Sequence, residues 1–433
     1  MLRAALILSL ALASKAAAVE FRSYDGHGGP VMGVAVAGDT VLTASFDNSV
    51  GLWTGGGAPV WLEGHAAAVN RVAFLPGDRA ASGGDDFDVI VWDLATRQAL
   101  HRLKGHRGKV VALAHDPGGA RLASAAWDGS IRLWNLATGA PLATFSDHRG
   151  AVTDLRWSGD GARLYSASSD GTVLEWNLAE GAPAQRLAAH GFGVNVLALN
   201  EAAGWLAYGA VDGGTRVLAL DDGRELADLT ADRRPILAMA LSPDGSRLAV
   251  GDGHGYIMVV DTATWEIARD FRAALNGPIW ALAFTADGAG VVAGGIADEA
   301  FLWPLDGGDS QPRMAELRRA FHTDPAAVGN GERQFLRKCS ICHTLGADGE
   351  RRAGPPLAGL MGRKAGSVAG YDYSSAVETS GIVWTDHTID RLFAEGPARY
   401  IPGTKMPMQM IASGRDRADL IEFLRRETSA TGE

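Results

Sequence analysis

Apolar and polar positions repeat along the first three hundred residues with a period near 42. Short β-branched or apolar runs each lead to an aromatic or aliphatic anchor, and the first three intervals between anchors are 39, 42 and 42 residues. The anchors are Trp53, Trp92, Trp134, Trp176, Leu218, Val260 and Trp303. Runs of this kind between turn residues are typical of strands, and a repeat of roughly 40–45 residues is typical of a four-stranded propeller blade. The pattern therefore predicts a seven-bladed, all-β propeller over residues 19–306.

Each of the first four units also places a histidine, a Ser or Thr and an aspartate at similar offsets before its tryptophan. The sets are His27, Thr43, Asp47 and Trp53; His65, Ser82, Asp86 and Trp92; His106, Ser124, Asp128 and Trp134; and His148, Ser166, Asp170 and Trp176. We expect each set to form a buried hydrogen-bond chain that helps to specify its blade, so these histidines are structural.

Units five to seven lack parts of this set, and we expect them to depend on apolar packing. The replacements are Tyr208 and Leu218 in the fifth unit, Val250, His254 and Val260 in the sixth, and Leu275, Ala293 and Ala297 in the seventh. The repeated Gly-His, Asp and Trp positions resemble the WD-repeat family. The seventh unit ends at Pro304 without an outer strand, so residues 19–24 are expected to pair with the last blade and leave no long exposed edge.

The only two cysteines of the chain lie in Cys339-Ser340-Ile341-Cys342-His343. This spacing is the attachment signature of c-type haem, with the two thiols bonded to the haem and the histidine beneath the iron. Half of a zinc site, a redox dithiol and chance are the alternatives. A zinc site normally needs further Cys or His at similar spacing, and a redox dithiol normally lies in a βαβ context that is missing here.

Residues 326–433 resemble the small monohaem c-type cytochromes with His/Met ligation, an all-α domain. The resemblance rests on Cys-x-x-Cys-His, on the Gly-Pro-x-Leu loop that begins at Gly354, and on the turn from Pro402 to Met406. It implies His343 as the proximal ligand and Met406 as the distal ligand, with Met408 as the alternative.

The same resemblance implies that the Pro355 carbonyl accepts the imidazole N–H of His343. It makes Tyr373, Trp384 and Thr404 candidate partners of the haem propionates, although Trp384 could equally be a core residue. One haem c is therefore the expected cofactor, bound covalently through Cys339 and Cys342. Val377 and Leu392 stand where related proteins have polar residues, which favours a drier haem pocket.

Residues 1–18 are typical of a cleaved signal peptide, with Arg3, an apolar run and Ala16-Ala17-Ala18. The run is too short to span a bilayer, and no later segment could span one. We therefore expect an exported protein, periplasmic in a bacterium, which agrees with haem attachment outside the cytoplasmic membrane. Residues 307–325 read as a flexible linker between the two domains.

Charge is shared unequally between the two domains. Residues 19–306 contain 21 Lys and Arg against 34 Asp and Glu, whereas residues 326–433 contain 14 against 13. An acidic propeller argues against a nucleic-acid partner and favours a basic protein surface, although solubility alone also explains it. Phe46 and Trp127, just before turn aspartates, and the nearby Phe87 are expected at one end of the ring, where a redox partner could dock.

The sequence favours an exported cytochrome that transfers single electrons, with the propeller as a docking scaffold rather than a catalyst. Two alternatives remain open at this stage. The propeller could be an oxidoreductase that uses the cytochrome domain as its electron acceptor, or the haem could report redox state or a gas. The electron donor and acceptor, the pathway, the reduction potential, the oligomeric state and any propeller ligand cannot be read from the sequence, because a fold does not fix a function.

Overall fold

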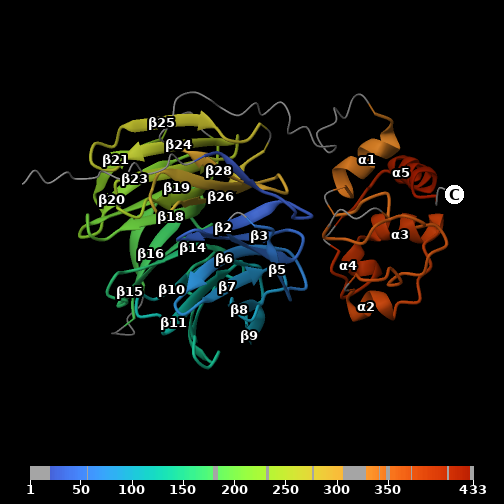
Figure 1. Ribbon diagram of the computed structural model, residues 1–433, viewed down its shortest axis with the longest axis horizontal. Coiled ribbons are helices and arrows are strands. Elements are labelled where there is room, and N and C mark those ends of the chain that lie inside the picture. The colour runs from blue at the N-terminus through green and yellow to red at the C-terminus, as the bar shows by residue number, and fades with distance from the viewer. Residues whose placement is uncertain are drawn as a thin grey trace, which may run out of the picture.

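The computed structural model contains seven four-stranded antiparallel sheets followed by a small helical domain (Figure 1). It describes residues 20–55, 57–178, 184–230, 234–275, 277–305, 328–340, 342–347, 352–371, 373–406 and 409–429. The expected signal peptide (1–18), the expected linker (307–325) and Met408 lie outside these ranges. Among the described residues, no helix is long and apolar enough to cross a membrane.

Each sheet is one propeller blade, and its strands follow one another in sequence order. Blade 1 contains β2 (Val31–Ala37), β3 (Thr40–Ser45), β4 (Ser49–Thr54) and β5 (Val60–Glu63). Blade 2 contains β6 (Val69–Leu75), β7 (Arg79–Gly84), β8 (Val89–Asp93) and β9 (Gln98–Leu103). Blade 3 contains β10 (Val110–His115), β11 (Arg121–Ala126), β12 (Ile131–Asn135) and β13 (Pro141–Phe145). Blade 4 contains β14 (Val152–Trp157), β15 (Arg163–Ser168), β16 (Thr172–Asn177) and β17 (Gln185–Ala189).

The last three blades follow the same plan with one exception in blade 7. Blade 5 contains β18 (Val194–Asn200), β19 (Trp205–Ala210), β20 (Thr215–Ala219) and β21 (Glu225–Asp228). Blade 6 contains β22 (Ile236–Leu241), β23 (Arg247–Asp252), β24 (Tyr256–Asp261) and β25 (Ile267–Arg272). Blade 7 contains β26 (Ile279–Phe284), β27 (Gly290–Gly295), β28 (Ala300–Pro304) and, as its outer strand, β1 (Arg22–Tyr24).

The ring closes through β1, as the sequence predicts. β1 pairs antiparallel with β28, with Arg22 opposite Leu302 and Tyr24 opposite Ala300. The ring of Tyr24 is buried and makes an edge contact with the Trp53 ring of blade 1, with 5.5 Å between the centroids. The first and last parts of the propeller are therefore joined by backbone hydrogen bonds and by side-chain packing.

The predicted hydrogen-bond chains are present in blades 1 to 4. In blade 3, Trp134 Nε1 donates to Ser124 Oγ (2.8 Å), the hydroxyl lies 2.8 Å from His106 Nε2, and His106 Nδ1 lies 3.1 Å from Asp128 Oδ2. The other three sets, which include His27, His65 and His148, have the same connections. Because the ring nitrogens of these histidines are engaged within the blade, the structural interpretation of the four residues holds.

Blade 5 keeps more of the chain than the sequence analysis expects. His190 Nε2 lies 2.9 Å from Asp212 Oδ1, and His190 Nδ1 lies 3.1 Å from the hydroxyl of Tyr208. The imidazole is turned over relative to blades 1 to 4, because the longer tyrosine brings its hydroxyl to the opposite ring nitrogen. The expectation that blade 5 depends on apolar packing is therefore wrong at this position, because Tyr208 takes part in a polar contact with His190.

Trp303 of blade 7 has a buried indole N–H without a hydrogen-bond partner in the described structure. Its neighbour Ala293 occupies the position that Ser124 has in blade 3, since Ala293 lies opposite Phe301 as Ser124 lies opposite Arg132. Ala293→Ser should supply the missing acceptor and raise the free energy of unfolding by about 1 kcal/mol.

Chemical denaturation followed by circular dichroism would measure this gain. Val250→Ser in blade 6 is the matched control, because the anchor position there is Val260, which has no N–H to satisfy. That variant should destabilise the protein. Equal losses of stability in both variants would contradict the assignment of Trp303 as an unsatisfied donor.

The blade networks also predict acid sensitivity. Burial lowers the pKa of His106 and His148 in spite of their neighbouring carboxylates. Burial alone would raise the pKa of Asp170, but hydrogen bonds from Thr172, the Arg149 amide and His148 outweigh it and lower that pKa to about 2. When a native pKa lies below the unfolded value, the unfolded state binds more protons at acidic pH.

Stability of the propeller should therefore fall as the pH drops below about 6.5, the ordinary histidine value, and fall again below about 4 as unfolded aspartates take up protons. Thermal unfolding at a series of pH values would test this. His148→Gln should weaken the first decrease relative to wild type. A midpoint that rises on acidification from pH 7 to pH 5 would contradict the prediction.

The C-terminal domain packs five helices around one apolar core. They are α1 (Asn330–Lys338), α2 (Ser375–Glu378), α3 (Asp386–Glu395), α4 (Pro397–Tyr400) and α5 (Gly414–Glu427). α1 packs against α5 through the rings of Phe335 and Phe423, 5.6 Å apart between centroids. Gly331 is required at this crossing, because a Cβ there would lie 2.1 Å from the Asp419 carbonyl oxygen. This packing fixes the end of α1, from which the Cys-x-x-Cys-His segment continues.

Candidate functional site

The two cysteines and the histidine lie on one tight turn directly after α1. The Cys339 amide donates to the Phe335 carbonyl and ends the helix, and the amides of Cys342 and His343 both donate to the Cys339 carbonyl at 3.0 and 2.9 Å. The turn brings residues 339, 342 and 343 together at the edge of the apolar core, which includes Cys339. The described part of the segment thus places the thiol and imidazole groups in one site.

Both thiols lie in apolar surroundings. Burial raises the pKa of Cys339 to about 12 and that of Cys342 to about 11. Both groups are therefore neutral thiols at physiological pH, not the reactive thiolate that a redox dithiol uses. Among the described residues, no cluster of three or more His, Cys, Asp or Glu could hold a metal ion. The site thus lacks the features of both a redox dithiol and a zinc site.

His343 is oriented by the loop that begins at Gly354. Its Nδ1 lies 2.7 Å from the carbonyl oxygen of Pro355. Since a carbonyl can only accept, Nδ1 carries the proton and Nε2 keeps a free lone pair, the arrangement that a metal-binding imidazole needs. Burial lowers the pKa of His343, the nearby charge of Arg363 acts in the same direction, and the bond to Pro355 opposes them. The ring is therefore neutral and ready to bind a metal through Nε2.

Arg363 holds this loop in place, a role that the sequence analysis did not assign. Its Nη1 donates to the Ala358 carbonyl (2.6 Å) and its Nη2 to the Pro356 carbonyl (2.9 Å). The Leu357 amide also donates to the Thr344 carbonyl (2.8 Å), which links the loop to the turn after His343. The sequence signal is a basic residue a few positions after a Gly-Pro loop, and it does not by itself indicate which carbonyls are bound.

The candidate distal ligand lies in the second loop of the domain. Gly403 has a φ of 91°, which favours glycine, and the turn it forms is closed by the Thr404 amide donating to the Ile401 carbonyl. The Met406 amide then donates to Thr404 Oγ1 (3.2 Å), and the Met406 side chain packs against the apolar core. A thioether is therefore held at the edge of the same core that contains Cys339.

The remaining candidate residues surround this core. Tyr373 and Trp384 pack against it, and the Tyr371 and Tyr373 rings meet edge to face with 4.7 Å between their centroids. Thr404 Oγ1 already accepts a bond within its own turn. Propionate contacts of Tyr373, Trp384 and Thr404 stay predictions. Val377 and Leu392 are buried members of the core, so these two positions are apolar in the fold as in the sequence.

The donor groups present fit haem c. Two thiols, a neutral imidazole with a free Nε2 and a thioether are the attachment and axial groups of a His/Met haem. The buried hydroxyl of Ser374 has no hydrogen-bond partner in the described structure, which leaves a polar atom for a ligand with acceptor groups. The chain therefore offers the attachment groups, both kinds of axial donor and an apolar surround.

Gly354 is essential to this geometry. A Cβ added there would lie 2.4 Å from Cε1 of His343, 2.7 Å from its Nδ1 and 2.8 Å from the Cys342 carbonyl oxygen. Backbone and ring cannot both move aside, so Gly354→Ala should displace the imidazole and reduce the yield of haem-loaded protein roughly tenfold or more, the scale of effect of a disturbed ligand environment.

The yield is measured as haem absorbance per mole of purified chain. Gly414→Ala is the matched control, because its Cβ would meet only the flexible end of Arg417 at 3.6 Å. That variant should load haem normally. Normal loading of Gly354→Ala would show that His343 does not need the observed position.

The aromatic residues proposed for partner docking lie on the propeller. Phe46, Phe87 and Trp127 belong to the turns between the second and third strands of blades 1, 2 and 3, so they share one end of the ring. Phe87 and Trp127 are 41% and 57% exposed, whereas Phe46 is half-buried. Lys109 Nζ lies 5.2 Å from the centroid of the Trp127 ring. No ring-to-ring contact among the described residues joins the three, so they form no single cluster, and only Phe87 and Trp127 are exposed.

Known families match both parts of the chain. The WD domain, G-beta repeat, matches residues 19–54, 60–93, 97–135 and 139–177, and Cytochrome c matches residues 328–427. Over 98 residues the chain is 48% identical to a cytochrome c of Arabidopsis thaliana, covering 87% of that protein and 23% of this chain.

Two further relatives give the same result. A cytochrome c of Gibberella zeae is 44% identical over 101 residues, covering 94% of that protein and 23% of this chain. A cytochrome c of Theileria annulata is 43% identical over 106 residues, covering 88% of that protein and 24% of this chain. Each of these likenesses is confined to about a quarter of the chain.

Proposed function

The chain belongs to the cytochrome c family through residues 328–427, and we propose that it is an exported carrier of single electrons with one covalently bound His/Met haem. The family supports a haem c cofactor, an electron-transfer function and redox partners. Covalent attachment and the His343 ligand are supported by the turn after α1, where two thiols adjoin an imidazole held 2.7 Å from the Pro355 carbonyl. The Met406 ligand is supported by its place at the edge of the same apolar core.

The chain's own residues each have a defined task in this proposal. Cys339 and Cys342 would tether the cofactor, and His343 and Met406 would bind its iron. Haem, when bound, supplies an iron centre that gains and loses one electron. The Pro355 carbonyl holds the imidazole tautomer, and Arg363 holds the loop that carries Pro355. The buried residues Val377 and Leu392 favour a pocket that excludes water.

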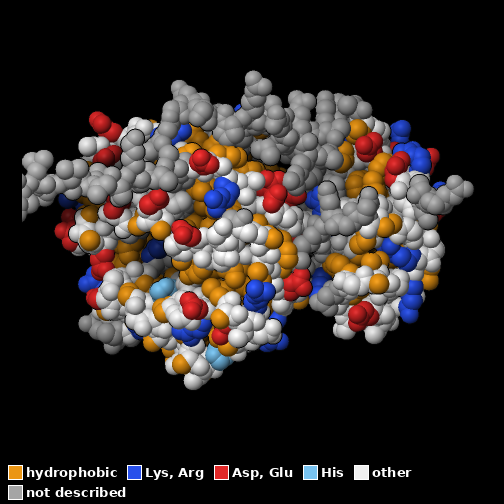
Figure 2. Space-filling view, viewed as in Figure 1, with side chains coloured by type: hydrophobic (Ala, Val, Ile, Leu, Met, Phe, Trp, Pro, Cys, Tyr) orange, Lys and Arg blue, Asp and Glu red, His pale blue; other side chains and the backbone are white. Residues whose placement is uncertain are grey.

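The propeller would serve as the docking scaffold for a redox partner. Support comes from its excess of acidic residues and from the exposed aromatic rings at one end of the ring. In the face drawn in Figure 2, acidic side chains are scattered over the propeller rather than gathered in one patch. Such a field favours encounter with a basic partner, while Phe87 and Trp127 supply apolar contact area. Periplasmic export is supported by the leader-like residues 1–18 and by the need of haem c for attachment outside the cytoplasm.

The test is to express the chain, with its own leader, in a bacterium that attaches haem c, and to recover it from the periplasm. We expect one haem per chain that acidified organic solvent does not extract, and reversible one-electron reduction. Cys339→Ala/Cys342→Ala should yield an exported but colourless protein. Extractable haem in the wild type would contradict covalent attachment, and an additional cofactor in the propeller would favour a catalytic propeller.

Docking is tested separately by the rate at which the reduced protein passes electrons to a co-purified partner. Phe87→Ala/Trp127→Ala should lower the second-order rate. Leu142→Ala/Ile267→Ala removes side chains that are 51% and 52% exposed on outer strands of blades 3 and 6, and it should leave the rate unchanged. Equal rates for both double variants would exclude the aromatic face.

A further inference from the structure

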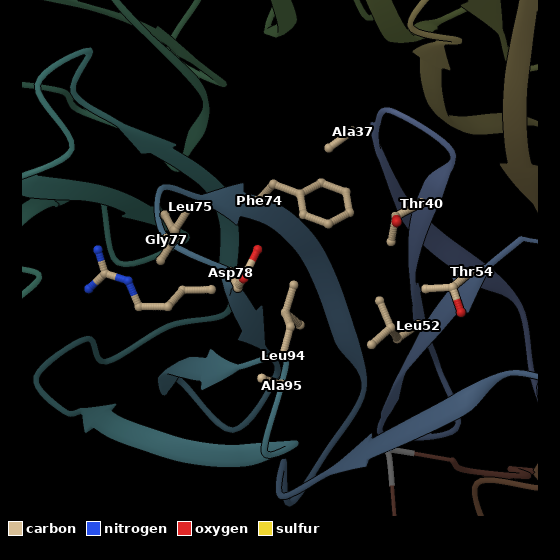
Figure 3. Close-up of a pocket in the computed structure, with 11 residues that line it drawn as sticks. Ala37, Thr40, Leu52, Thr54, Phe74, Leu75, Gly77, Asp78, Leu94 and Ala95 are labelled. Atoms are coloured by element: carbon tan, nitrogen blue, oxygen red, sulfur yellow. The ribbon is translucent and has the colours of Figure 1, made fainter.

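A cavity of about 460 Å³ lies between blades 1 and 2, lined by residues of both (Figure 3). It lies at the end of the ring opposite Phe46, Phe87 and Trp127. Its position follows from the topology, since it lies at the turns between the first and second strands, whereas Phe46 and Phe87 lie in the next turns along the blades. The volume falls within the range of pockets that hold small ligands. None of the haem-site residues lines it.

The walls of the cavity are mainly apolar. Leu52 of β4 forms the blade 1 side, and Phe74 of β6 and Leu94, just after β8, form the blade 2 side. All three belong to, or pack against, the core between these two blades. The cavity is therefore the place where this inter-blade core opens to the surface, and an aliphatic chain inserted there would leave water without breaking any hydrogen bond.

Asp78 is the only acidic residue among those that line the cavity. Its carboxylate makes no hydrogen bond or ion pair with the described part of the chain. The neighbouring Arg79 does not neutralise it directly, because its Nε donates to the Pro76 carbonyl (2.9 Å) and its Nη1 to the Leu136 carbonyl of blade 3 (3.2 Å). The Arg79 guanidinium is thus directed toward blade 3. The Asp78 carboxylate lies at the apolar cavity without a partner in the described part of the chain.

The corresponding turns of other blades use their aspartates differently. In blades 3, 4, 6 and 7 the aspartate of this turn accepts hydrogen bonds from groups of the same turn. These residues are Asp116, Asp160, Asp244 and Asp287. Asp39 of blade 1, like Asp78, has no such bond in the described structure. The turn aspartates whose charge remains available are therefore the two in blades 1 and 2, beside the cavity.

We propose that this cavity receives a lysine side chain of a partner protein. The four-carbon stem would lie against Leu52, Phe74 and Leu94, and the ammonium would reach the Asp78 carboxylate. A long charged side chain buries its stem and keeps its charged end at the surface, as this arrangement requires. Lysine supplies both parts of this fit, because its unbranched four-carbon stem ends in a compact ammonium. The site is independent of the haem and would give the propeller a second contact surface.

The probe is the peptide acetyl-Gly-Gly-Lys-Gly-Gly-amide, titrated into the full-length protein with labelled leucine methyl groups. We expect saturable shifts of the Leu52 and Leu94 methyls at millimolar peptide, with no shift at Leu197 in blade 5. The norleucine peptide, which keeps the stem but lacks the charge, should bind about threefold to fivefold more weakly, as expected for one exposed ion pair.

Two variants separate the contributions of charge and cavity. Asp78→Asn should remove the preference for lysine over norleucine, and Thr54→Trp, at an exposed position of the cavity wall, should prevent binding of both peptides. Glu266→Gln removes the same charge from an exposed position in blade 6 and should change nothing. An unchanged lysine preference in Asp78→Asn, or Leu52 shifts that persist in Thr54→Trp, would overturn the proposal.

Discussion

A chain in which Phe21 and Tyr24 are both alanine should unfold about 4 kcal/mol more easily than the wild type. The two rings anchor the closing strand of the propeller. Phe21 makes an edge contact with Trp303 at 5.0 Å between centroids, and Tyr24 contacts Trp53 at 5.5 Å. Loss of both rings leaves cavities in blades 7 and 1 and frees the edge of β28, so the ring can open at one point.

The control for this experiment lies in the same strand. Arg22 and Ser23 are exposed, so Arg22→Ala/Ser23→Ala keeps the pairing of β1 with β28 and should be close to wild type. Denaturant unfolding followed by the circular dichroism of the propeller measures both. Similar midpoints for the two double variants would mean that β1 is not needed to close the ring.

Much of the propeller could be predicted because residue types recur at similar offsets from one sequence unit to the next. The spacing of the anchor positions gives the number of blades. In blades 1 to 4 the His, Ser or Thr and Asp positions give the contacts, since one order of donors and acceptors satisfies them all. The polar contact of Tyr208 with His190 could not be predicted, for a local reason. A tyrosine hydroxyl reaches the opposite ring nitrogen, and side-chain reach is not visible in a pattern of residue types.

The haem site was predictable to a different extent. Cys339, Cys342 and His343 follow from their spacing, and the bond to Pro355 follows from family resemblance. The role of Arg363 depends on which carbonyls face its guanidinium, so it could not be predicted from the sequence and is visible only in the structure. The cavity beside Asp78 could not be predicted either, because it is formed by side chains of two blades whose sequence positions, near 52 and 78, show no special pattern.

Replacing Met406 by alanine should strongly change the electronic state of the haem. A thioether favours the ferrous iron, so its loss should lower the reduction potential by on the order of 0.2 V, within the ~0.8 V range that axial ligands span. It should also open the iron to carbon monoxide and cyanide and abolish the weak near-infrared sulfur-to-iron band of the ferric form. Potentiometric titration and ligand-binding spectra measure these changes.

Comparison of methionine variants identifies the ligand. Met410 is 51% exposed, so Met410→Ala should keep the band and the potential, and Met406→His should restore six ligands at a lower potential than wild type. If Met408→Ala loses the band and Met406→Ala keeps it, the ligand is Met408, two residues further along the loop. A wild type that already binds carbon monoxide readily would have an open iron site. The electron-transfer proposal would then give way to gas sensing or catalysis. A carrier with both axial positions filled changes its oxidation state with little rearrangement, and an open iron site lacks this property.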